Sequence, residues 1–599
     1  MNIAQDTDSI GKLPEWNLDD LYPGPDSAEF AADKKRCLED AQAFEGRIKG
    51  NLPKLLESGG GDLADAISEY EKIGEIMGRL MSYAGLAYAS DTTDAGKAKL
   101  YGDTQEALTR ASSHILFFTL ELNSLDDGEI ENAMLENAAL GRYRPWIEDT
   151  RLEKPYQLED RIEQLFHDKS ATSASAWNRL FDETMAALRF NIDGQELASE
   201  PVFNLLQESD RDTREKAARE IGKVLSQNGR LFTLITNTLC KDKQISDEWR
   251  GFDDVAGSRH LANRVEPEVV DALAGAVRKA YPRLSHRYYQ MKANWLGLDK
   301  MQYWDRNAPP PQSAERRYEW SDAQKTVLDA YGSFSPEMAD IASRFFDRSW
   351  IDAPVRDGKR SGAFAHPTVP SVHPYVLLNY QGRPRDVMTL AHELGHGVHQ
   401  VLAAEQGPLM SQTPLTLAET ASVFGEMLTF RAMLDQCSDR LERQAMLAQK
   451  VEDMINTVVR QIAFYQFERE VHQARANGEL TWEQLCSLWI DVQKESLGPV
   501  FEFDESYQSY WSYIPHFIHS PFYVYAYAFG DCLVNSLYAV YQHSEDGFQA
   551  RYFDMLKAGG TRHHRELLAP FGLDASDPAF WDKGLSMIEG LIDELEALE

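Results

Sequence analysis

Apolar residues recur at spacings of three and four along most of the chain, and this periodicity constrains the fold more than any other feature. In residues 62–82 the apolar positions alternate with charged ones, the pattern of an amphipathic helix with one buried face. The same periodicity returns in residues 158–189, 211–236, 268–297, 415–434, 441–467 and 584–598. The sequence therefore predicts a mainly α protein.

Strand-like sequence is concentrated in residues 361–380, where prolines, a glycine and a β-branched and aromatic run occur together. We expect a small β-sheet there, with a last strand at about 375–380 that leads into the next helix. The break at residues 191–194, Asn-Ile-Asp-Gly, is the best candidate for a lobe boundary, although its residues equally suit a hairpin within one domain. We accordingly expect two helical lobes, residues 1–195 and 196–599.

The chain is strongly acidic, with 95 Asp and Glu against 61 Lys and Arg and a formal net charge of −34 over 599 residues. Such a charge repels nucleic-acid backbones and anionic lipid surfaces, so neither is an expected partner. The five cysteines are scattered without a Cys-x-x-Cys spacing, which argues against a disulfide framework and a thiolate metal site. Because the amino terminus lacks a secretory signal and no apolar run is long enough to span a bilayer, we expect a cytoplasmic protein.

Five of the 15 histidines fall between positions 366 and 399, and the centre of this group is His392-Glu393-Leu394-Gly395-His396. On a helix, His392 and His396 lie one turn apart on the same face, where both can bind one metal ion. Glu393 is displaced by about 100° and can reach a water on that ion without ligating it. The pattern predicts a zinc site, and the alternative is a solvated helix with two surface histidines.

Gly395 and Gly397 are unexpected in the interior of this helix, because each glycine there costs about 1 kcal/mol relative to alanine. Their presence indicates that some group must approach the backbone closely there, and the alternative is tight helix packing.

A catalytic zinc ion generally takes three protein ligands, so a third ligand is required. The metzincin pattern is absent, because Leu402 occupies the position of its third histidine. A carboxylate from the following segment is the other solution, and the candidates are Glu405, Glu419 and Glu426. Glu405 lies near the end of the same helix and points away, whereas Glu419 opens a new helix after two proline breaks. We expect Glu419 to be the ligand, with Glu426 as either a partner that orients a ligating histidine or an ordinary acid.

Four segments resemble the thimet oligopeptidase family of zinc metallopeptidases, and most closely its oligoendopeptidase F subfamily. They are residues 13–22 (LPEWNLDDLY), 367–380 (PTVPSVHPYVLLNY), 386–400 (DVMTLAHELGHGVHQ) and 414–426 (PLTLAETASVFGE). The resemblance implies two helical lobes flanking a deep substrate channel, with the small sheet next to the zinc-binding helix and residues 196–599 as the catalytic domain. It also implies one Zn²⁺ held by His392, His396 and Glu419, with Glu393 as the general base.

Residues 514–530 carry a dense set of proton donors. Amide hydrolysis requires donors aimed at the oxyanion that forms, and Tyr523 and Tyr527 share a helical face whereas Tyr525 points elsewhere. The resemblance implies that His516 and Tyr523 bind substrate and stabilise the tetrahedral intermediate. An aromatic stripe in the core is the alternative interpretation.

These observations together predict a zinc-dependent metalloendopeptidase that hydrolyses internal bonds of short oligopeptides, with a zinc-activated water and Glu393 as general base. The strand near residues 361–366 can offer a free edge on which an extended peptide pairs. One alternative is a carboxypeptidase with the same zinc motif. The other is a helical scaffold with a structural metal, which does not require Glu393.

Overall fold

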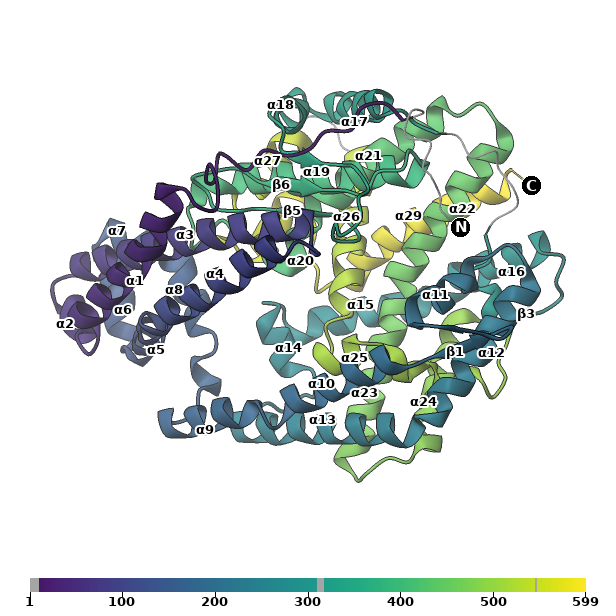
Figure 1. Cartoon of the computed structure of the whole chain (residues 1–599), viewed down its shortest axis with the longest axis horizontal. Helices are drawn as coiled ribbons and strands as arrows, with labels where there is room; N and C mark the ends of the chain where they lie inside the picture. The colour runs from purple at the N-terminus through teal and green to yellow at the C-terminus, as the bar shows by residue number, and fades with distance from the viewer. Residues whose placement is uncertain (1–9, 310–316, 544–546, 599) are drawn as a thin grey trace. The chain divides into compact units, whose positions relative to one another are not determined.

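Helices account for most of the structure (Figure 1), a computed structural model that describes residues 10–309, 317–543 and 547–598. The prediction of a mainly α fold is confirmed. No helix in this described part of the chain is long and apolar enough to cross a bilayer.

The chain divides into two units that alternate along the sequence. Unit 1 comprises Met1–Lys154, Glu315–Gln436 and Ser544–Gly572, and unit 2 comprises Pro155–Ala314, Cys437–His543 and Leu573–Glu599. The units therefore change over first at residues 154–155. The functional division into a lobe of residues 1–195 and a catalytic domain of residues 196–599 stays a prediction.

Unit 1 is built from helices with one small sheet. Its α-helices are α1 (Ala28–Ile48), α2 (Leu52–Glu57), α3 (Gly61–Ser90), α4 (Ala95–Ser113), α5 (Leu116–Ser124), α6 (Asp127–Glu136), α7 (Ala138–Gly141), α8 (Arg144–Arg151), α17 (Trp320–Phe334), α18 (Pro336–Asp347), α19 (Pro384–Ala403), α20 (Leu415–Ala418), α21 (Thr420–Gln436), α27 (Phe548–Lys557) and α28 (His564–Leu568). Its strands are β4 (Ile351–Asp352), β5 (Phe364–His366) and β6 (Tyr375–Leu377).

Unit 2 is also helical, with two short strand pairs. Its α-helices are α9 (Asp160–Ser170), α10 (Ala174–Ala187), α11 (Ser199–Asn204), α12 (Arg211–Gln227), α13 (Gly229–Arg250), α14 (Gly257–Ala262), α15 (Pro267–Ala280), α16 (Ser285–Trp295), α22 (Arg440–Thr457), α23 (Val459–Ala476), α24 (Trp482–Leu497), α25 (His516–His519), α26 (Tyr525–His543) and α29 (Pro578–Glu596). Its strands are β1 (Phe190–Ile192), β2 (Gln195–Leu197), β3 (Met301–Gln302) and β7 (Phe501–Glu502), and the 3₁₀ segments η5 (Tyr303–Asp305) and η7 (Tyr507–Tyr513) follow β3 and β7.

The sheet of unit 1 has the strand order β4-β6-β5, with β4 parallel and β5 antiparallel to β6. The register pairs Phe364 with Leu377 and His366 with Tyr375, so β5 is an edge strand. Gln400 of α19 donates to the carbonyl of Ala365 over 3.4 Å, which places this edge beside the helix (Figure 1). The predicted small sheet next to the histidine-bearing helix is therefore confirmed.

The break at residues 191–194 forms a β-hairpin. Strands β1 and β2 pair antiparallel, and Asp193 and Gly194 take positive φ angles of 52° and 87° in the turn. Both strands belong to unit 2. The sequence left open a lobe boundary or a hairpin within one domain, and the structure has a hairpin here.

Helix α19 has a defined start and a buried body. Pro384 occupies its first turn, and the carboxylate of Asp386 accepts from the backbone N–H groups of Gln381 (2.9 Å) and Arg383 (3.0 Å), which caps the helix. Most of the helix from Val387 onward is buried. This burial argues against the interpretation as a solvated surface helix.

Glycines let α19 approach its neighbours closely. A Cβ on Gly395 would lie 2.4 Å from the carbonyl oxygen of Ala421 in α21, and one on Gly397 would lie 2.5 Å from the ring of Phe345 in α18. The close approach expected at these glycines is therefore tight helix packing.

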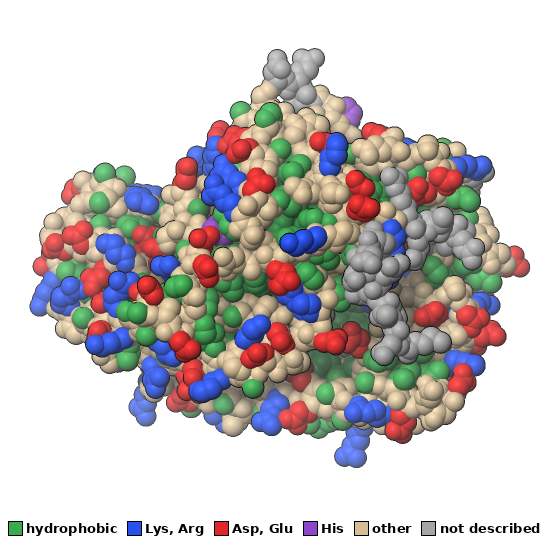
Figure 2. Space-filling model, turned by 45° about the horizontal axis from the view of Figure 1, so that its top comes forward, with side chains coloured by type: hydrophobic (Ala, Val, Ile, Leu, Met, Phe, Trp, Pro, Cys, Tyr) green, Lys and Arg blue, Asp and Glu red, His purple; other side chains and the backbone are tan. Residues whose placement is uncertain are grey.

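The face of the molecule in Figure 2 carries acidic and basic side chains intermixed. Acidic groups are spread over this face and do not gather at one place.

Replacement of Gly395 by alanine should lower the free energy of unfolding by about 1–3 kcal/mol, because the added methyl group overlaps the backbone of α21. Gly275→Ala in α15 is the matched control, since a Cβ there meets nothing within 4 Å and alanine should stabilise that helix by up to about 1 kcal/mol. Urea unfolding of the metal-free proteins measures both changes. Equal unfolding midpoints for the two variants would contradict the tight packing.

Candidate active site

Three side chains of metal-ligand type converge where α19 packs against the start of α21. The Nε2 atoms of His392 and His396 lie 3.4 and 3.5 Å from Oε2 of Glu419, which stands between α20 and α21. The two imidazole centroids are 5.0 Å apart, and one ligand atom from each residue lies within 4.8 Å of the others. Donors around a tetrahedral ion with bonds of about 2.1 Å lie about 3.4 Å apart, so the three residues fit one such ion.

Neighbouring groups orient two of these three side chains. Nδ1 of His392 lies 3.0 Å from Oε2 of Glu426, which leaves its Nε2 toward Glu419. The hydroxyl of Ser422 donates to Oε2 of Glu419 over 2.7 Å. A carboxylate on the far nitrogen of a ligating histidine fixes its tautomer and ring orientation. The contact of Glu426 is the one that an orienting partner of His392 would make, and this role stays a prediction.

The charges of the site are strongly coupled. Burial opposes protonation of His392, but the hydrogen bond to Glu426 and the negative charges of Glu426, Glu419 and Glu393 raise the pKa of this imidazole to about 9. Burial opposes ionisation of Glu419, yet the neighbouring His396 and His392 lower the pKa of its carboxyl. The acids thus favour positive charge on His392, whereas burial lowers the pKa of His396 to about 4 and keeps that imidazole neutral.

Glu393 lies beside the cluster and is itself buried, with 7% of its surface exposed. Burial raises the pKa of its carboxyl to about 7, although the neighbouring His392 and the backbone of Ala365 act in the opposite direction. A carboxyl with a pKa near neutrality can both accept and return a proton.

The other candidates of the region lie outside the cluster. His399 is buried and places Nε2 3.1 Å from the hydroxyl of Thr413, and burial lowers the pKa of this imidazole to about 4. Glu405 is exposed in the short 3₁₀ turn after α19. Of the three acids considered from the sequence, Glu419 is therefore the one that lies beside the Nε2 atoms of both histidines.

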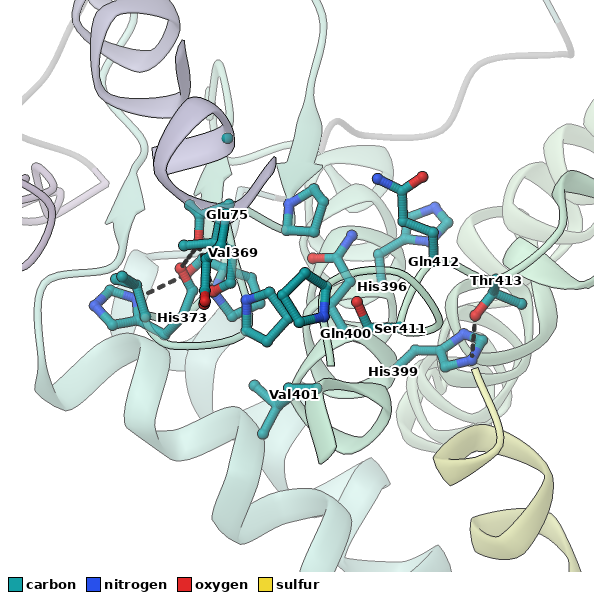
Figure 3. Close-up of a pocket in the computed structure, with 18 of the residues that line it drawn as sticks. Glu75, Val369, His373, His396, His399, Gln400, Val401, Ser411, Gln412 and Thr413 are labelled. Carbon is teal, nitrogen blue, oxygen red and sulfur yellow. Dashed lines mark hydrogen bonds between the residues drawn. The ribbon is translucent and has the colours of Figure 1, made fainter. Parts of the chain in front are cut away.

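A cavity of about 610 Å³ adjoins His396 within unit 1. Its walls come from α3, the segment 367–374, the second half of α19 and the segment 408–413, and they include Glu75, Val369, Gln400 and Gln412 (Figure 3). This volume is within the usual range of small-ligand pockets.

The aromatic cluster expected in residues 514–530 is present in unit 2. Nε2 of His516 lies 3.3 Å from the hydroxyl of Tyr527, and the rings of Tyr523 and Tyr527 are 5.3 Å apart. Tyr525 is buried, and its hydroxyl accepts from the side-chain amide of Asn263 over 2.9 Å. The grouping of Tyr523 with Tyr527 and the separate direction of Tyr525 are confirmed. The oxyanion-stabilising roles of His516 and Tyr523 stay predictions.

Tyr523 lies in a turn before α26, and a buried acid holds that turn. Phe522 has a φ angle of 61°, and its N–H donates to Oε1 of Glu468 in α23 over 2.8 Å. Arg259 of α14 donates to the carbonyl of Pro521 over 3.1 Å. Both contacts fix the backbone next to Tyr523.

Several supporting residues were not predicted from the sequence. Ser422 follows Glu419 by three residues on one helix face, so its spacing was an available signal. Glu468 and Ala365 come from segments distant in sequence from their partners, and no local pattern identifies them.

The profile of peptidase family M3 matches residues 204–587, and the profile described as oligopeptidase F matches residues 121–190. The chain belongs to peptidase family M3. Family M3 members are metallopeptidases, so the expected enzyme class, a hydrolase acting on peptides, is confirmed.

Individual relatives align with nearly the whole chain. Oligopeptidase PepF of Bacillus subtilis is 27% identical, with 100% of this chain and 89% of the relative aligned. An oligoendopeptidase F homologue of Borreliella burgdorferi is 25% identical over 98% of this chain and 99% of its own. The crystal structure of oligoendopeptidase F from Enterococcus faecium has the same fold, with a TM-score of 0.71, 23% identity and coverage of 95% of this chain and 98% of that one.

Glu468→Gln should make the protein more stable at alkaline pH. Burial raises the pKa of the Glu468 carboxyl to about 8, above its ordinary value of 4.5, so the folded protein holds a proton that the unfolded chain releases. Stability should therefore fall as the pH rises from about 5 to 8, by a few kcal/mol at most, since each pKa unit corresponds to about 1.4 kcal/mol. The glutamine variant keeps the acceptor for Phe522 and should lose most of this slope. Urea unfolding of both proteins at pH 5.5 and 8.5 measures this pH dependence. An equal loss of stability between the two pH values in the parent and in Glu468→Gln would refute the raised pKa of Glu468.

Proposed function

We propose that the protein is a zinc-dependent endopeptidase that cleaves internal bonds of short oligopeptides. The observation that carries the proposal is the convergence of His392, His396 and Glu419 beside the buried carboxyl of Glu393. The names of the relatives, oligopeptidase and oligoendopeptidase F, support short peptides as the substrate class.

The ligand set suits zinc, because two imidazoles and one carboxylate are a common catalytic donor set for this ion and leave a position open. His392, His396 and Glu419 would hold the ion, and Glu426 and Ser422 would orient two of these ligands. Zinc bound there supplies a Lewis acid that polarises the scissile carbonyl and acidifies a water molecule.

Glu393 performs the proton transfers. Its carboxylate accepts a proton from the water that attacks the peptide carbonyl carbon, and it then delivers that proton to the amine that leaves when the C–N bond breaks. Its pKa of about 7 lets it serve in both directions near neutral pH.

His516 and Tyr523 stabilise the oxyanion that forms from the scissile carbonyl. Their N–H and O–H groups donate to the carbonyl oxygen as it gains negative charge, which lowers the barrier to attack. The edge of β5 pairs with the extended backbone of the substrate peptide, and the cavity beside His396 receives part of that peptide.

Hydrolysis of a short peptide blocked at both ends tests the proposal. The parent protein should cleave an internal bond, and Glu393→Gln should lose activity by at least about a thousandfold while it retains bound zinc. Glu419→Gln should lose both zinc and activity. Glu405→Gln, which changes an exposed acid near the end of α19, should behave as the parent.

Three other results would point elsewhere. If the parent cleaves only peptides with a free carboxyl terminus, the protein is a carboxypeptidase with the same zinc motif. Zinc binding without any cleavage would favour a scaffold. Full activity in Glu393→Gln would exclude this residue as the base.

Tyr523→Phe should reduce kcat by about 10²–10³-fold with little change in KM, because the lost hydroxyl acts only on the developing oxyanion. Tyr527→Phe is the matched control, since its hydroxyl lies 3.3 Å from His516 in the same cluster. A large loss in Tyr527→Phe with normal turnover in Tyr523→Phe would assign the role to the other tyrosine.

A further inference from the structure

Arg306 and Arg460 of unit 2 have no carboxylate partner among the residues that the structure describes. Arg306 follows η5, and Arg460 lies in the first turn of α23. Both are half-buried, and in the described part of the chain neither forms an ion pair with an acidic side chain. Other arginines of this unit are paired; Arg278, for example, lies 2.8 Å from Glu495.

Neighbouring side chains hold the guanidinium of Arg460 in place, but one of its donors has no hydrogen-bond acceptor in the described structure. Its guanidinium lies 5.0 Å from the ring centroid of Phe464, and one Nη lies 3.5 Å from the hydroxyl of Tyr513. Its Nε is buried and has no hydrogen-bond partner in the described structure. A buried donor without an acceptor is unfavourable, so the guanidinium of Arg460 retains unused capacity to donate to an anion.

Glu452, which Lys292 links to the backbone of Arg306, is already neutralised. Glu452 accepts from Nζ of Lys292 over 2.7 Å and from the hydroxyl of Tyr288 over 3.1 Å. Lys292 also donates to the backbone carbonyl of Arg306, over 2.5 Å. A local excess of positive charge therefore remains at Arg306 and Arg460, within a chain whose net charge is −34.

The segments next to the two arginines pack together: the ring centroids of Tyr303 in η5 and Tyr507 in η7 are 4.6 Å apart, and η7 ends at Tyr513, the neighbour of Arg460. Burial and the positive charge of Arg306 lower the pKa of Arg460. Two like charges that share one environment are relieved by an anion bound near both.

The pair lies close to the aromatic cluster. Tyr513, the neighbour of Arg460, ends η7 three residues before His516. After burial, the charge of Arg460 is the largest influence that lowers the pKa of His516. An anion on this pair would therefore lie near the residues proposed to contact the substrate.

We propose that Arg460, together with Arg306, binds a carboxylate of the peptide substrate, either the α-carboxylate at its carboxyl terminus or an acidic side chain. This inference rests on the proposed peptidase function. The planar guanidinium fork of arginine matches a carboxylate, and the hydroxyl of Tyr513 supplies a further donor beside it. The enzyme then selects substrates by charge at one position.

Paired peptides of one sequence test the proposal. One ends in a free carboxyl, the second in an amide, and a third carries the amide together with one internal glutamate in place of glutamine. At least one carboxylate-bearing peptide should show kcat/KM about tenfold above the neutral amide in the parent protein, mostly through KM. Arg460→Gln should reduce that ratio to within about twofold, and Arg460→Lys should restore part of it. Arg278→Gln, which changes a surface ion pair, should keep the parental ratio.

The outcomes separate this proposal from the function on which it rests. Preference for the free carboxyl identifies the terminus as the source of the carboxylate, and preference for the glutamate identifies a side chain. Equal cleavage of all three peptides by the parent, or a preference unchanged in Arg460→Gln, would overturn the carboxylate site while leaving the peptidase intact. Absence of cleavage in all three would refute the peptidase, and calorimetric titration of the free-carboxyl peptide into parent and Arg460→Gln would then test the carboxylate site alone.

Discussion

The close contact of α19 with α21 is the constraint on which the candidate active site depends. Gly395 lets the backbone of α21 approach to a distance that a side chain would prevent, and that approach brings Glu419 to the histidine pair. The same contact aligns Glu426 with the far nitrogen of His392. Gly395, which lies between the two histidines, therefore permits the close contact that brings the carboxylate of Glu419 to them.

Burial at this point has an electrostatic consequence. Three carboxyl groups and two imidazoles occupy a small volume from which most solvent is excluded, and each group alters the protonation of the others. The neighbouring histidines lower the pKa of Glu419 and favour its ionised form, whereas burial raises the pKa of Glu393 to about 7. The same surroundings thus give two glutamates different chemical characters, one suited to hold a cation and one to carry a proton.

The sequence predicted those features that depend on local periodicity. The histidine pair, the position of Glu393 and the helical character of the chain all follow from spacings of three and four residues. Glu419 was predictable because chain breaks limited the number of acids that could return to the histidines. The contacts of Glu468 with Phe522 and of Arg460 with Tyr513 were not predictable, since each joins segments about 50 residues apart. The hairpin at residues 190–197 was ambiguous because an Asp-Gly turn serves equally within a domain and between domains.

The alternation of the two units along the chain affects how the protein can be made. Helix α27 packs against α19, and the hydroxyl of Tyr552 donates to the carbonyl of Thr420, a residue 132 positions earlier. During synthesis the ribosome therefore releases the histidine-bearing helix long before the segment that completes its surroundings. The segment Cys437–His543 of unit 2 must emerge in between, so the surroundings of the histidine-bearing helix can form only when translation is almost finished. A nascent or carboxy-terminally truncated chain would carry the complete histidine motif without the packed helix that supports it.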